Sequence, residues 1–169
     1  REQLRRGVDW VKMMVTGGIM TQGTDPRRQQ LFRDEIEAVV ETAHAAGVRV
    51  AAHCQGGPGL PDALRAGIDS LEHGIWLDDA SIDLLLERDT AFVPTLSAIY
   101  LISKGEPVAG VKPPAWSIEK ARIATEAHRE SFARAVGAGV RIIAGTDYRH
   151  GSLPFEMRLM DEWGMDTAD

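Results

Sequence analysis

The chain has 169 residues, of which 44% are hydrophobic and 26% charged, and its formal net charge is −6. This composition allows a domain with a buried core, and the absence of a basic patch or a long apolar run argues against a nucleic-acid or membrane partner. One cysteine, Cys54, excludes an internal disulfide and is typical of a reducing compartment, so we expect a cytoplasmic protein.

Apolar periodicity predicts strands that alternate with helices. Residues 1–7 are typical of the last turn of a helix that ends at Gly7. We expect Ser117 to be the N-cap of a long helix, preceded by a loop over residues 97–116. The expected strands are 8–15, 48–53, 68–73, 90–95 and 140–147. The expected helices, including the long one from Ser117, are 32–46, 61–67, 78–89, 117–138 and 154–163.

A repeated unit joins these elements, because AGV or AGI precedes a strand at residues 46–48, 66–68 and 138–140. Helix, glycine and buried strand in succession predict an α/β fold with a parallel sheet and right-handed crossovers. A closed (β/α)8 TIM barrel has about 250 residues, so five units fit part of one, about strands 4 to 8 with their helices. An open doubly wound sheet is the alternative, which periodicity does not exclude. The initial Arg1 and the end just after a helix favour residues 1–169 as a single partial barrel domain, excised from a longer protein.

Four polar residues lie in or at the carboxyl ends of four expected strands: Lys12, His53, His73 and Asp147. Taken singly, each has an ordinary explanation, such as a core histidine, a turn aspartate or a Lys12–Glu72 ion pair. In parallel α/β folds, however, this edge of the sheet binds ligands. Imidazole nitrogens and carboxylate oxygens suit Zn²⁺ and similar ions. Together the four residues therefore indicate a candidate metal site.

The motifs around these residues resemble a known family. VKMMVTGG, AAHCQG, LEHG and GTD, in this order, are similar to the metal-dependent amidohydrolase superfamily, above all to its imidazolonepropionase-like and Xaa-Pro dipeptidase-like branch. The segments VPTLSAIY and EKARIATEAHRESFARAVGAGV extend the resemblance over nearly the whole chain.

The resemblance implies a role for each residue of the candidate site. Lys12 matches a lysine that becomes a carbamate and bridges two divalent metals, with zinc as the expected metal. His53 and His73 match ligands of one metal. Asp147 matches a ligand of the other metal that is also the general base and acid when a metal-activated hydroxide attacks a C–N bond of an amide, cyclic amide or dipeptide. Glu72, Thr16 and Thr146 are candidates for outer contacts to these ligands.

One part of the family's pattern has no counterpart in this sequence, the His-X-His pair of the first strand. The remaining histidines are His44 and His128, which we expect to face solvent or neighbouring helices, and His150. We therefore expect this chain alone to hold at most one metal ion and to have little or no activity.

The expected partner is a small-molecule amide or dipeptide. The mouth of the site is expected to include Tyr100, Tyr148, Arg149 and His150, and Gln55 stands where relatives often have a second histidine. Arg149 suits a bidentate pair with a substrate carboxylate.

Two other readings remain open. One is a metal-free α/β barrel in which Lys12 forms a Schiff base. The other is a non-catalytic half-barrel that forms homo-oligomers through its open edge strands, residues 8–15 and 140–147.

Overall fold

The structure is a computed structural model that describes residues 1–108, 110–149 and 151–166. Within them, four parallel strands form one sheet in chain order: β1 (Trp10–Met14), β2 (Arg49–Cys54), β3 (Ser70–His73) and β4 (Ala91–Val93). The helices are α1 (Glu2–Arg5), α2 (Arg33–His44), α3 (Gly59–Ala66), α4 (Asp79–Arg88), α5 (Leu96–Ser103), α6 (Ala115–Ala138) and α7 (Leu153–Glu162). None of the helices described is long and apolar enough to cross a membrane.

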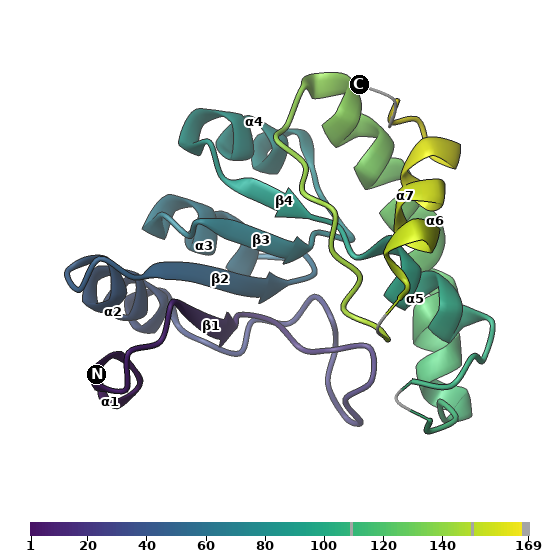
Figure 1. Ribbon diagram of the computed structural model, residues 1–169, viewed down its shortest axis with the longest axis horizontal. Coiled ribbons are helices and arrows are strands. Elements are labelled where there is room, and N and C mark those ends of the chain that lie inside the picture. Colours follow the sequence, from purple (N-terminus) through teal and green to yellow (C-terminus); the bar gives the residue numbers. More distant parts are fainter. Residues whose placement is uncertain (109, 150, 167–169) are drawn as a thin grey trace.

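One face of the sheet carries the hydrophobic core. Val50, Ala52, Leu71 and Phe92 alternate inward along β2, β3 and β4 and form one buried cluster with residues of the covering helices, among them Leu64 of α3. Helices α2, α3 and α4 pack in succession along this face, whereas α5, α6 and α7 gather at the end toward which the strands point (Figure 1).

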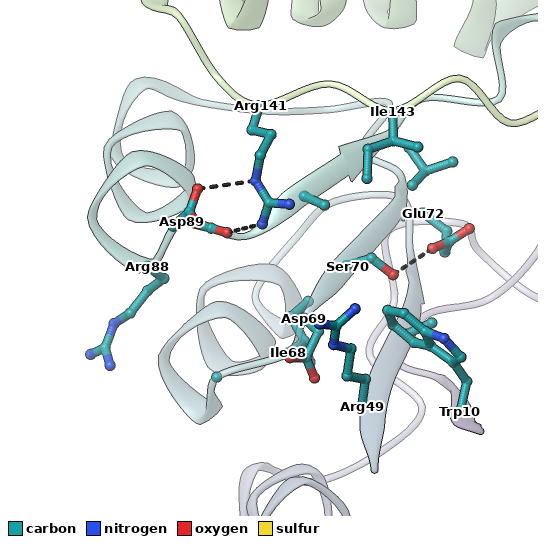
Figure 2. A pocket seen from close by; sticks show the side chains of 14 residues that line it. Trp10, Arg49, Ile68, Asp69, Ser70, Glu72, Arg88, Asp89, Arg141 and Ile143 are labelled. Carbon is teal, nitrogen blue, oxygen red and sulfur yellow. Dashed lines mark hydrogen bonds and ion pairs between the residues drawn. The ribbon is translucent and has the colours of Figure 1, made fainter. Parts of the chain in front are cut away.

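The other face of the sheet is open and concave. Trp10, Arg49, Ser70 and Glu72 project from it, and Arg141 and Ile143 border it from the segment that follows α6 (Figure 2). A doubly wound sheet has helices on both faces, but here they cover one, as the outer ring of a barrel does. The predicted α/β fold and parallel sheet are confirmed, and the arrangement is that of a partial (β/α)8 barrel.

The expected fifth strand, residues 140–147, is reduced to a single bridge. Ile142 pairs with Phe92 in parallel, with Phe92 N–H donating to the Arg141 carbonyl and Ile143 N–H donating to the Phe92 carbonyl, both at 2.9 Å. The ladder stops there because β4 ends at Val93, before Pro94, which has no N–H to donate. The expectation of a full strand was therefore wrong.

Two further expectations were wrong. The expected loop 97–116 contains helix α5, which starts at Leu96 directly after β4. Ser117 is not an N-cap, because α6 begins at Ala115 after Pro114, and the buried Ser117 hydroxyl lies against the sulfur of Met20 instead.

Candidate metal and catalytic site

Two of the predicted site residues lie in contact and the other two lie close by, at the carboxyl end of the sheet. The rings of His53 and His73 are 4.5 Å apart, centroid to centroid, in an edge-on arrangement. His73 Nε2 lies 3.8 Å from Asp147 Oδ2. Lys12 Nζ lies 3.6 Å from Glu72 Oε2, as the ion-pair explanation expects. Lys12 reaches Glu72 across β2 because the residue paired with it there is the small Ala51.

The backbone around these side chains adopts an uncommon conformation. His73, Thr95 and Asp147 have φ values of 78°, 54° and 43°, in the left-handed region that non-glycine residues seldom enter. Strand alternation alone would point the side chains of Glu72 and His73 to opposite faces of the sheet. The left-handed turn at His73 breaks the alternation and lets its ring meet that of His53. Such strain is concentrated at functional sites.

Hydrogen bonds fix which nitrogen of each imidazole carries the proton. The Thr95 hydroxyl donates to the Pro94 carbonyl at 2.6 Å, so its oxygen accepts from His73 Nδ1–H at 2.7 Å. The Gly17 carbonyl can only accept, so His53 Nε2–H donates to it at 3.2 Å. The lone pairs therefore remain on Nε2 of His73 and on Nδ1 of His53.

Burial keeps both imidazoles neutral. It lowers the pKa of His73 well below the usual histidine value, and the neighbouring His53, Lys12 and His128 lower it further. Burial also lowers the pKa of His53, assisted by the charge of Lys12 and opposed by the hydrogen bond to Gly17. Neutral imidazole is the form that binds metal ions.

Lys12 and Asp147 have pKa values shifted in opposite directions. Burial lowers the pKa of Lys12, although Glu72 and Asp147 oppose the shift. Burial raises the pKa of Asp147, and Lys12 opposes that shift. Solvent still reaches 46% of the Lys12 side chain and 68% of that of Asp147, so both remain accessible.

These donors fit a divalent ion in kind. Two neutral imidazoles and a carboxylate are ligand types that zinc and related metals use. In both His53 and His73 one ring nitrogen is hydrogen-bonded and the other is free. Metal-binding histidines commonly show this arrangement. The described residues nevertheless contain no group of three or more His, Cys, Asp or Glu side chains close enough together to hold an ion. A bound ion would need these side chains to draw closer or a further donor, such as Lys12 in a carboxylated form.

His128 was missed as a neighbour of the site. We expected it to face solvent or a neighbouring helix, but it is fully buried on α6, and its Nε2–H donates to the His73 carbonyl at 2.9 Å. Burial lowers its pKa to about 4. A signal was present in the sequence, because Ala121, Ala124 and Phe132 are buried on the same helical face as His128.

A second missed residue is Glu156 on α7, which is 0% exposed. Its two carboxylate oxygens accept the backbone N–H groups of Leu96 and Ser97 at the start of α5, each at 2.7 Å. No local pattern in the sequence signals a contact between residues 60 positions apart.

The residues expected at the mouth of the site have varied surroundings. Tyr100 packs against Phe155 and Trp163, and the Tyr148 hydroxyl donates to the Pro107 carbonyl at 2.5 Å. Arg149 is exposed and its guanidinium lies over the Tyr148 ring. His150 lies outside the described residues.

Gln55, Thr16, Glu72 and Thr146 were expected to surround the metal-binding side chains, and each makes or lacks specific hydrogen bonds. Gln55 is 1% exposed, and its Oε1 has no hydrogen-bond partner among the residues described. Its N–H donates to the hydroxyl of the buried Thr16. Glu72 accepts from Ser70 as well as facing Lys12, and the Thr146 carbonyl accepts from Ser97.

Known proteins share this sequence and fold. The family model described as "Amidohydrolase family" matches residues 1–167. Ochratoxinase of Aspergillus niger is 34% identical over an alignment 153 positions long, which covers 89% of this chain and 31% of that protein. An uncharacterised Mycobacterium tuberculosis protein is 36% identical over an alignment 176 positions long, which covers 97% of this chain and 44% of that protein.

A crystal structure of a Xaa-Pro dipeptidase with methionine bound in its active site superposes with a TM-score of 0.88 and 33% identity, covering 97% of this chain and 41% of that one. The chain thus spans less than half the length of each of these relatives. The resemblance carried by VKMMVTGG, AAHCQG, LEHG and GTD is confirmed, and the chain belongs to the amidohydrolase family.

Proposed function

We propose that this chain forms the catalytic part of a metal-dependent hydrolase that cleaves C–N bonds of small amides, cyclic amides or dipeptides. The observation that carries the proposal is the contact of two neutral imidazoles, each with one nitrogen held by an acceptor and one left free, beside Asp147. Family membership supports amide hydrolysis, and the Xaa-Pro dipeptidase and ochratoxinase relatives support a small-molecule substrate.

His53 through Nδ1 and His73 through Nε2 would hold a divalent ion, with zinc the best match to the donors. The chemistry that such an ion supplies when bound is a lowered pKa for a water molecule and polarisation of the scissile carbonyl. The protein's part is to keep both imidazoles neutral and correctly protonated. Burial and the acceptors Gly17 and Thr95 do this.

Asp147 is the proposed general base and acid. Its Oδ2, near His73 Nε2, would take a proton from the attacking water and return it to the departing nitrogen. Two properties support this role. Burial raises the carboxyl pKa toward neutrality, which makes the acid form easier to reach, and solvent exposure of the side chain leaves room for a substrate.

Lys12 is the proposed site of carboxylation. Its neutral amine would attack CO₂ through Nζ, forming an N–C bond and releasing one proton to solvent, and the product is a carbamate anion. Because burial lowers the lysine pKa, more of the reactive amine is present at neutral pH than on an exposed lysine. A carbamate would repel Glu72, so the modification needs a nearby cation to replace the present ion pair.

Three broader expectations stay proposals. The partner is a small amide or dipeptide rather than a nucleic acid or a membrane, and the protein works in the cytoplasm, where Cys54 remains a thiol. Association of two copies through the edge strand β1, which carries the half-exposed Trp10 and Met14, is the proposed oligomeric contact.

The test is hydrolysis of Xaa-Pro dipeptides and N-acyl amino acids by the purified protein, with added Zn²⁺ or Mn²⁺ and after chelation. Because the chain alone is expected to have little activity, we expect weak turnover that requires the metal and is lost in His53→Ala and His73→Ala but kept in His44→Ala, a control histidine exposed on α2. Metal-independent turnover, or covalent trapping of a carbonyl compound on Lys12 by borohydride, would contradict the proposal and favour the Schiff-base reading.

A further inference from the structure

The start of helix α5 is capped in an unusual way. Thr95 occupies the N-cap position, where a threonine hydroxyl ordinarily accepts an N–H of the first helical turn. Here Thr95 has left-handed backbone angles, φ 54° and ψ 42°, and its side chain makes no capping hydrogen bond. The ordinary local cap is therefore absent from this helix.

A carboxylate from another helix replaces that cap. Glu156, 0% exposed on α7, accepts the N–H groups of Leu96 and Ser97 through its two oxygens, both at 2.7 Å. These are the first two residues of α5, whose N–H groups have no partner within the helix. A buried carboxylate is stable only when it is bonded in this way, and the partial positive charge of the helix N-terminus adds to its stability.

This replacement frees the Thr95 hydroxyl. That hydroxyl donates to the Pro94 carbonyl and accepts from His73 Nδ1–H, which leaves the lone pair of His73 on Nε2, beside Asp147. If Thr95 capped its own helix, its oxygen would turn to the N–H groups of α5 and His73 Nδ1 would lose its partner.

We propose that Glu156 is a positioning residue that acts through Thr95, and that by capping α5 in place of Thr95 it sets the proton on Nδ1 of His73 and the lone pair on Nε2. That the free Nε2 of His73 serves to bind a metal rests on the proposed function. The effect of Glu156 on the His73 tautomer does not depend on that function, because the tautomer can be observed in the metal-free protein.

The experiment is ¹⁵N NMR of the imidazole nitrogens in the metal-free protein, near neutral pH, together with Zn²⁺ affinity. In the wild type, the spectrum should show His73 protonated at Nδ1. Glu156→Gln removes the charge and one acceptor, so we expect a mixture of His73 tautomers and zinc binding weaker by about 10-fold or more, the usual effect of disturbing a residue that orients a metal ligand.

Variants of Thr95 and a remote cap separate positioning from general stability. Thr95→Val should give the same tautomer mixture, Thr95→Ser should restore the wild-type spectrum, and adding Glu156→Gln to Thr95→Val should change the spectrum no further. Asp78→Asn is the matched control, since Asp78 caps α4 by accepting the Ser81 N–H, at a helix the proposal does not link to His73. It should lower stability and leave His73 unchanged.

Each outcome decides the matter. An unchanged His73 spectrum in a folded Glu156→Gln protein would overturn the proposal. So would failure of both Glu156→Gln and Glu156→Asp to fold, because Glu156 would then act on the whole fold. If the tautomer changes as expected but the wild type does not bind Zn²⁺, the positioning role stands and the proposed function fails.

Discussion

Acidification should destabilise the folded protein through His128. This side chain is fully buried, and burial lowers its pKa from the usual 6.5 to about 4. Between these two values the unfolded chain binds a proton that the folded chain does not, so stability falls as the pH falls. At about 1.4 kcal/mol for each pKa unit, the full shift is worth about 3.5 kcal/mol. About 3 kcal/mol of this stability is lost by pH 4, and about 2 kcal/mol between pH 7 and pH 5.

The assay is urea unfolding of the metal-free protein at pH 7 and pH 5, for the wild type and for His128→Gln. Glutamine keeps an N–H donor for the His73 carbonyl but does not titrate, so the variant should lose about 2 kcal/mol less than the wild type between the two pH values. His53 and His73 add to the wild-type loss, while the raised pKa values of Asp147 and Glu156 act in the opposite direction. Comparing the two proteins cancels these contributions, except for the part of the His73 shift that His128 itself causes. Equal losses in the wild type and His128→Gln would refute the reasoning.

Three other predictions concern the site and the core. Asp147→Asn should lower kcat by about 100-fold or more with an unchanged thermal midpoint, because its side chain is 68% exposed; equal turnover in Asp147→Asn and the surface control Asp83→Asn would count against it. The 169-residue chain should bind at most one Zn²⁺ after dialysis, because among the described residues only His53 and His73 bring imidazoles together at the site; two tightly held ions measured by elemental analysis would contradict this. Phe132→Ala should lower the free energy of unfolding by about 3–5 kcal/mol, since Phe132 is 0% exposed in the main core, and a loss below 1 kcal/mol in urea titrations would show that the core relaxes around it.

The sheet and the positions of its polar residues were predictable because strand periodicity is local. Alternation along residues 10–14 and 49–54 puts Lys12 on the same face of the sheet as Trp10, and His53 on the same face as Ala51. The carboxyl ends of parallel strands meet at one edge, so ordering the motifs along the chain also brought His53, His73 and Asp147 together.

Most of the missed features depend on contacts between distant residues. Helix α5 has no local side-chain cap, and its partner Glu156 lies 60 residues further along the chain. His128 bonds to a carbonyl 55 residues away, which no spacing rule reveals. The shortened fifth strand depends on where its neighbour β4 ends. Left-handed backbone at His73 is equally invisible, because histidine rarely adopts it.

The cap on α5 also affects when the hydrogen bonds of the site can form during synthesis of the chain. A chain leaves the ribosome from its N-terminus, so His53, His73 and Thr95 emerge well before Glu156. The first N–H groups of helix α5 then cannot donate to Glu156 until α7 has been synthesised and has docked. All four strands lie before residue 94, but the imidazole of His73 reaches its final hydrogen bonding only when α7 is in place. A nascent chain stalled before residue 156 would have all four strands but an unfinished site.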